Sequence, residues 1–111
     1  MMQVRIKLMA AQPATMEFFE RRALEDFVVA GRKFSPKISI NLQVDYADGI
    51  WIISLPFLDA VGRSTNYSEA KRMLLEYIDF LWTEYVLSSG RELGETGKIL
   101  KDTLLEIFRV S

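Results

Sequence analysis

Residues 37–55 constrain the fold of this 111-residue chain more than any other segment, because they have the pattern of two strands joined by a tight turn. Apolar and polar residues alternate along the first half, as in a strand with one buried and one solvated face. Asp48-Gly49 then supplies the positive φ angles of a type I′ turn. The segment therefore predicts an antiparallel hairpin with strands at about 37–46 and 50–55.

The turn also sets the register of this hairpin. With Ala47 opposite Ile50, the pleat places six large apolar side chains on one face. They are Leu42, Val44, Tyr46, Trp51, Ile53 and Leu55. Ile50 and Ile52 then share the opposite face with Asp45.

Before the hairpin, residues 3–9 alternate again and predict a further strand of the same sheet. Apolar residues recur at helical spacing from Met16 to Val28, which favours a helix at about 15–30 ended by Gly31. The apolar run 27–30 is equally compatible with an edge strand, so residues 15–30 are either helical or partly extended.

After the hairpin, Asn66 and Glu69 form an Asn-x-x-Glu capping pattern that predicts the start of a helix at about 66–87. This helix carries more apolar surface than one small sheet can cover. A second amphipathic helix at about 95–109 is the segment able to cover it. The spacing leaves open whether this last helix folds back within the chain or pairs across a dimer.

The composition agrees with a single α+β domain over residues 1–111. Half of the residues (50%) are hydrophobic, enough for a core, and the net charge of −1 creates no global field for nucleic acid or an anionic membrane. Cysteine is absent, which excludes disulfides and fits a reducing compartment. No apolar run suits a membrane span or a leader. We expect a cytoplasmic protein.

The absence of His and Cys removes most catalytic and metal chemistry, including acyl-transfer triads and conventional zinc sites. The remaining candidate is a divalent-cation site made by Asp45, Asp48 and Asp59. The turn, the solvated strand face and a loop explain these three carboxylates without a metal. We therefore expect no enzyme activity and no cofactor.

Basic residues in the first third raise the possibility of nucleic-acid binding. They are Arg21, Arg22, Arg32, Lys33 and Lys37. Such a surface needs exposed aromatic rings for base stacking, but the predicted helical stripe places Phe19 in the core. Direct contact with nucleic acid is therefore disfavoured.

The run from Asp45 to Pro56, followed by Asn66-Tyr67-Ser68-Glu69-Ala70, resembles the HicB-like antitoxin fold. That family has a hairpin ending in Leu/Val-Pro and a Gly-x-Thr-x-x-Glu-Ala helix start. Here Ser64 replaces the Gly and Asn66 the Thr. The resemblance covers roughly residues 37–82. It implies a partial ribonuclease-H-like fold. It also implies a protein that inhibits a partner and does not catalyse a reaction.

Residues 38–89 carry a net charge of −4, which suits a basic partner. Together with the resemblance, this predicts a noncatalytic, antitoxin-like module that binds and inhibits a small basic toxin. The expected partner-binding residues are Asp45, Asp48, Ile50, Ile52 and Glu76. We also expect the chain to form a homo-oligomer. The alternative function is a stand-alone homo-oligomeric domain of the same fold without a toxin partner, and a nucleic-acid-binding regulator is the third possibility.

Overall fold

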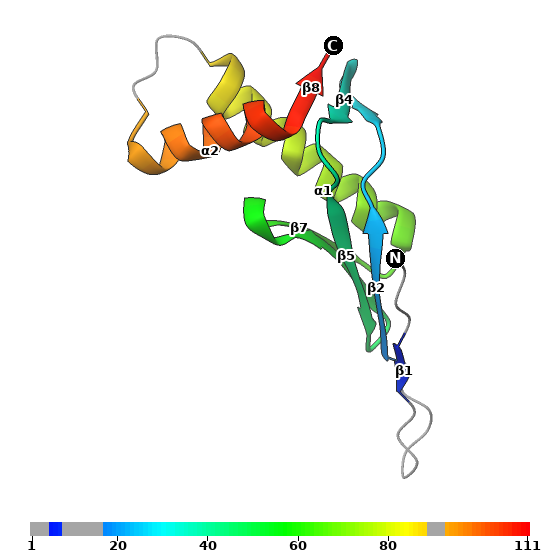
Figure 1. Cartoon of the computed structure of the whole chain (residues 1–111). Coiled ribbons are helices and arrows are strands. Elements are labelled where there is room, and N and C mark those ends of the chain that lie inside the picture. Colours follow the sequence, from blue (N-terminus) through cyan, green and yellow to red (C-terminus); the bar gives the residue numbers. More distant parts are fainter. Residues whose placement is uncertain (1–4, 8–16, 89–92) are drawn as a thin grey trace. The chain divides into compact units, whose positions relative to one another are not determined.

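The computed structural model describes residues 5–7, 17–88 and 93–111, and it has an α+β fold (Figure 1). The chain forms two compact units, each assembled from two separate segments. The first unit takes the described residues of 1–23 and 41–74, and the second takes those of 24–40 and 75–111. One helix begins in the first unit and continues in the second, so the division into two units does not by itself define two domains. The expectation of a single domain therefore stays a prediction.

The first unit contains a five-stranded antiparallel sheet of order β1-β2-β5-β6-β7. The strands are β1 (Arg5–Lys7), β2 (Glu17–Ala23), β5 (Asn41–Ala47), β6 (Ile50–Leu55) and β7 (Ala60–Ser64). The predicted hairpin register is confirmed, since Tyr46 pairs with Trp51 and Ala47 with Ile50. Asp48 and Gly49 at its turn have φ angles of 54° and 78°, as a type I′ turn requires.

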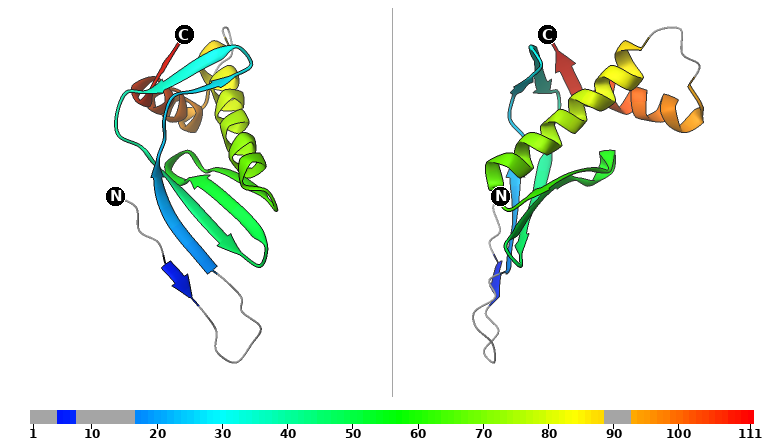
Figure 2. Two further views of the ribbon diagram at one scale, coloured as in Figure 1. Left: turned by 90° about the vertical axis from the view of Figure 1, so that its right-hand side faces the viewer. Right: turned by 180° about the vertical axis from the view of Figure 1, so that it is seen from behind.

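One face of this sheet is covered by the first half of α1 (Tyr67–Trp82), as Figure 2 shows. The core between them is apolar and consists mainly of Leu42, Val44, Ile53, Leu55, Ala70 and Leu74, all buried. Between β6 and β7 the chain makes a short 3-10 turn, η1 (Pro56–Leu58), which buries Leu58. Gly62 of β7 lies directly against the α1 backbone, and this close approach explains why the strand has no side chain there.

The predicted helix after the hairpin is confirmed, together with its cap. The backbone N–H of Glu69 donates to the Asn66 side-chain oxygen at 3.0 Å, which satisfies one free donor of the first turn. α1 ends at Trp82 and continues as one π-helical segment, η2 (Thr83–Leu87). The predicted end at about residue 87 is therefore correct for the helical segment as a whole.

The second unit combines the rest of α1 and η2 with a three-stranded sheet and a C-terminal helix. The elements are β3 (Phe27–Val29), β4 (Arg32–Pro36), β8 (Phe108–Val110) and α2 (Glu95–Ile107). The sheet order is β3-β4-β8, antiparallel throughout. α2 contacts η2 and buries Leu104 and Ile107, so the C-terminal helix folds back within its own chain.

Of the two alternatives for residues 15–30, the helix is wrong, and the edge strand in the apolar run 27–30 is confirmed. Residues 17–23 form β2, which pairs with β5, and residues 27–29 form β3 at the edge of the second sheet. β2 pairs with β5, which is distant in sequence, and β3 pairs with β4 across a short turn, so strand pairing overrides local helical spacing. Gly31 ends no helix but makes a positive-φ hairpin turn with Ala30. Residues 15 and 16 lie outside the described residues.

Several boundaries differ from the predicted ones. Of the strand expected at 3–9, residues 5–7 are extended, and the others lie outside the described residues. The strand expected from residue 37 begins at Asn41, after an irregular stretch in which Ile38 is exposed. The C-terminal helix ends at Ile107 and not at 109, because the chain there turns extended to pair with β4.

Candidate binding surface

The candidate functional surface is the face of the first unit's sheet that points away from α1. Residues paired across antiparallel strands project to the same side, so the register defines this face directly. One row across four neighbouring strands consists of Phe19, Asp45, Ile52 and Arg63. The next row consists of Arg21, Gln43, Ser54 and Val61. None of these eight residues is buried, whereas the α1 side of the same strands holds the core.

At the hairpin end of this face there is an open groove of about 580 Å³. Its lining consists of Ala47, Asp48, Ile50, Ile52, Arg63, Ser64 and Thr65. The two isoleucines provide apolar contact area. Asp48 and Arg63 are both exposed and bring one negative and one positive charge to the groove. The arrangement suits an apolar side chain inserted between charged neighbours, as at the anchor of a protein interface.

Asp45 is the unusual residue of this surface. It is half-buried between Phe19 of β2 and Ile52 of β6, and it makes no hydrogen bond or ion pair with any side chain of residues 19–88 and 93–111, the part of the chain whose side chains the structure describes. Burial raises the pKa of this carboxyl above its ordinary value. An ionised group held in apolar surroundings without a counter-charge costs stability.

We expect Asp45→Asn to increase the free energy of unfolding at pH 7 by a small amount, about 0.5 kcal/mol or less. The folded-state pKa of Asp45 is raised, so ionisation disfavours the folded state at neutral pH. This penalty disappears as the pH falls through the folded-state pKa and then below the unfolded value of about 3.9. Urea denaturation of both proteins at pH 7 and pH 3 tests this: the difference should be present at pH 7 and absent at pH 3. A variant less stable than the wild type at pH 7 would contradict it.

The structure brings together four of the five residues predicted to bind a partner. Asp45, Ile50 and Ile52 share the open face, and Asp48 lines the groove from the turn. Glu76 is exposed but lies on the second half of α1, in the second unit, and does not line this groove. Its contact with a partner stays a prediction.

Two residues in the same row as Asp45 were not predicted as site residues, Phe19 and Arg63. The expected helix placed Phe19 in the core, but it is half-buried on the open sheet face. Arg63 lies on β7, where small residues point toward α1 while Val61 and Arg63 point outward. That alternation of small and large residues over 60–63 was the available signal for this strand.

The opposite face of the same sheet carries a polar and aromatic cluster. Glu20 is buried and pairs with Arg22, whose guanidinium lies 5.1 Å from the centre of the Tyr67 ring and donates to the Tyr67 hydroxyl at 2.9 Å. Trp51 lies between the rings of Tyr46 and Tyr67. These contacts fix the start of α1 on the sheet, so the cluster has a structural role.

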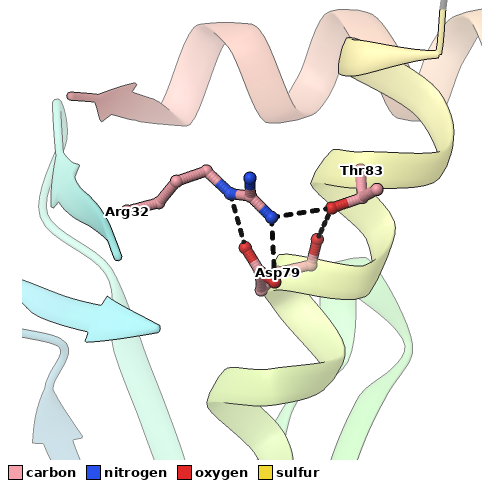
Figure 3. Close-up of polar contacts among 3 residues, drawn as sticks. All are labelled: Arg32, Asp79 and Thr83. Atoms are coloured by element: carbon pink, nitrogen blue, oxygen red, sulfur yellow. Dashed lines mark hydrogen bonds and ion pairs between the residues drawn. The ribbon is translucent and has the colours of Figure 1, made fainter. Parts of the chain in front are cut away.

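In the second unit, Arg32 joins β4 to α1 (Figure 3). Its guanidinium donates to both carboxylate oxygens of Asp79, at 2.9 and 3.2 Å, and to the Thr83 hydroxyl at 3.0 Å. The hydrogen bond to Asp79 raises the pKa of Arg32. Lys37 likewise donates to the Leu105 carbonyl. Arg32 and Lys37 therefore serve intramolecular contacts. Phe19, expected in the core, instead lies with exposed Arg21 on the open sheet face, so the absence of direct nucleic-acid contact stays a prediction.

Among residues 5–7, 17–88 and 93–111, no group of three or more carboxylates is placed to hold a metal ion. Asp45, Asp48 and Asp59 are therefore not assembled into the cation site considered from the sequence. No described helix is long and apolar enough to cross a membrane.

Searches of protein-family models, curated proteins and solved structures found no significant match to this chain.

Proposed function

We propose that this chain is a noncatalytic binding module, antitoxin-like in the sense of the HicB-like resemblance, that binds and inhibits a small basic protein through the open sheet face. The observation that carries the proposal is the combination of solvent-accessible Ile50 and Ile52 with a carboxylate, Asp45, that forms no ion pair with any side chain of residues 19–88 and 93–111. Apolar anchors supply affinity at an interface, and complementary charges supply steering and register.

A protein partner fits this surface better than a small molecule does. The surface is a sheet face with an open groove at one end, whereas small-molecule sites are concave and enclose most of their ligand. Acidic and basic groups both border the apolar floor, since Asp48 and Arg63 line the groove together. An interface of this kind has an apolar centre and a charged periphery.

The second candidate is a homo-oligomeric domain without a toxin partner. It is favoured by an exposed apolar stripe along α1 that continues into η2. Its members are Met73, Tyr77, Phe80 and Leu87, each at least 39% exposed. Tyr77 and Phe80 stack on each other at 5.9 Å and so present one continuous aromatic surface.

Co-purification of the tagged chain from its native host tests the proposal. The wild type should retain one small basic protein in stoichiometric amount. Ile52→Arg, which places a charge on the apolar floor, should lose it. Val28→Arg is the matched control, because Val28 is 66% exposed on a strand of the second unit, and it should retain the partner. Circular dichroism of each variant confirms folding.

Binding kinetics with the purified partner give a second test, in which two charge reversals should change the association rate in opposite directions. Charges at the edge of an interface mainly change the association rate. For a basic partner, Asp48→Lys should slow association and Arg63→Glu should speed it, and both effects should shrink at high salt.

Two outcomes would reject the proposal. One is retention of the same protein by the wild type and Ile52→Arg alike. The other is a stable oligomer with no partner, dispersed by Phe80→Glu but not by Ile52→Arg in sedimentation, which would support the homo-oligomer instead.

A further inference from the structure

Asp45 occupies the centre of the row that crosses the open sheet face. Its strand neighbours in this row are Phe19 on β2 and Ile52 on β6, each about 4.8 Å away by the spacing of paired strands. Arg63 is the next residue beyond Ile52, so its backbone lies about 10 Å from that of Asp45. The carboxylate thus has an aromatic residue on one side, an aliphatic side chain on the other, and no ion pair with any side chain of residues 19–88 and 93–111. Arg5 pairs with Phe19 at the other end of the row, so its backbone lies about 10 Å from that of Asp45.

We propose that Asp45, flanked by Phe19 and Ile52, is the docking site for a lysine or arginine side chain of the partner protein. The inference rests on the proposed function, and it names the chemical group that the open face selects. The partner's cation would form an ion pair with the Asp45 carboxylate. Its aliphatic stem would pack against Ile52, and the Phe19 ring would add a cation–π contact.

The neighbouring residues explain why the occupant is a long basic side chain. A simple metal ion would require several oxygen ligands, and the described residues hold no such group. A neutral polar side chain would leave the carboxylate without a counter-charge. A lysine or arginine supplies both the charge for Asp45 and apolar length for the two flanking side chains.

Ile52 links this site to the groove, because it flanks Asp45 and also lines the groove with Ile50. A partner segment that places its cation on Asp45 would therefore bring a neighbouring side chain to the groove. The groove lining favours an apolar residue there. The recognised segment is thus a basic residue next to an apolar one.

The test uses a capped tetrapeptide of alternating leucine and lysine as the probe. Titration into the full-length protein is followed by NMR of the isoleucine methyl groups and the Phe19 ring. Saturable shifts should be confined to Phe19, Ile50 and Ile52. Asp45→Asn should weaken binding about tenfold, the loss expected for one charged hydrogen-bonded contact.

Asp59→Asn is the matched control. It removes the same charge from an exposed position of the first unit, and Asn tolerates the positive φ of 54° at residue 59. It should leave the affinity within about twofold of the wild type. The same peptide with glutamate in place of lysine should not bind.

The proposal is overturned if Asp45→Asn binds the lysine peptide as tightly as the wild type, or if the shifts fall outside this face. Its failure can be separated from that of the proposed function. If the native partner is lost by Ile52→Arg but retained at full affinity by Asp45→Asn, the open face binds the partner and the cation site is wrong. If neither variant weakens that partner, both proposals are wrong.

Discussion

Gly62→Ala should unfold the first unit or bring it close to unfolding, although it adds a single methyl group. An ideal Cβ at this position would lie 1.9 Å from the carbonyl oxygen of Ala70 and 2.8 Å from the backbone nitrogen of Leu74. Both atoms belong to the α1 backbone, which cannot move aside as a flexible side chain does. We expect a loss of about 3 kcal/mol or more in the free energy of unfolding. This is the upper end of the range for substitutions that overpack a protein core, about 1–3 kcal/mol. Urea denaturation measures it.

Gly94→Ala is the control for this prediction. Gly94 precedes α2 with a φ angle of −67°, and no atom lies within 4 Å of the position that a Cβ would take. Alanine is a poorer N-cap than glycine, so this substitution should cost about 1 kcal/mol or less, well below the loss for Gly62→Ala. Equal effects of the two substitutions would mean that α1 does not approach β7 as closely as described.

The hairpin and α1 could be predicted from the sequence because their signals are local. Asp48-Gly49 determines the turn and hence the register of β5 with β6. Asn66 supplies the cap whose hydrogen bond the structure contains. Each signal acts within a few residues, so no knowledge of distant contacts was needed.

The strands β2 and β7 could not be predicted in the same way. Residues 17–23 lack an alternating pattern, because the face toward α1 includes the charged pair Glu20 and Arg22. β7 is short and carries small residues where a core strand usually has large ones, since Gly62 must fit under α1. In both cases the decisive constraint comes from a partner element far away in the sequence.

The residues of the candidate surface also divide into those fixed by local signals and those fixed by distant strands. Ile50, Ile52 and Asp45 could be placed on one face from the hairpin register alone. Phe19 and Arg63 belong to the same row only through the pairing of β2 with β5 and of β7 with β6. The isoleucines and the carboxylate were therefore predictable, whereas their aromatic and basic neighbours required the sheet order.

Phe34→Ala should produce the largest loss of stability in the second unit. Phe34 is fully buried, stacks on Phe27 at a centroid distance of 4.8 Å, and makes edge contacts with Trp82 at 5.8 Å and Phe108 at 5.6 Å. Its removal leaves a cavity between two strands and a helix and breaks all three ring pairs. Truncation of a buried Phe costs about 3–5 kcal/mol of stability. We expect the upper half of that range, because the three aromatic pairs stabilise the fold beyond the burial of apolar area alone.

Two further variants distinguish the loss of the Phe34 ring contacts from a general sensitivity of this sheet to substitution. Phe34→Leu keeps most of the buried volume and should lose less than half as much as Phe34→Ala. Val28→Ala, on the neighbouring strand at 66% exposure, should change the free energy of unfolding by no more than about 0.5 kcal/mol. Near-ultraviolet circular dichroism should show Trp82 losing its fixed environment in Phe34→Ala only. If all three variants unfold at the same urea concentration, Phe34 is not the centre of this core, and β4 is held by its pairing with β3 and β8 alone.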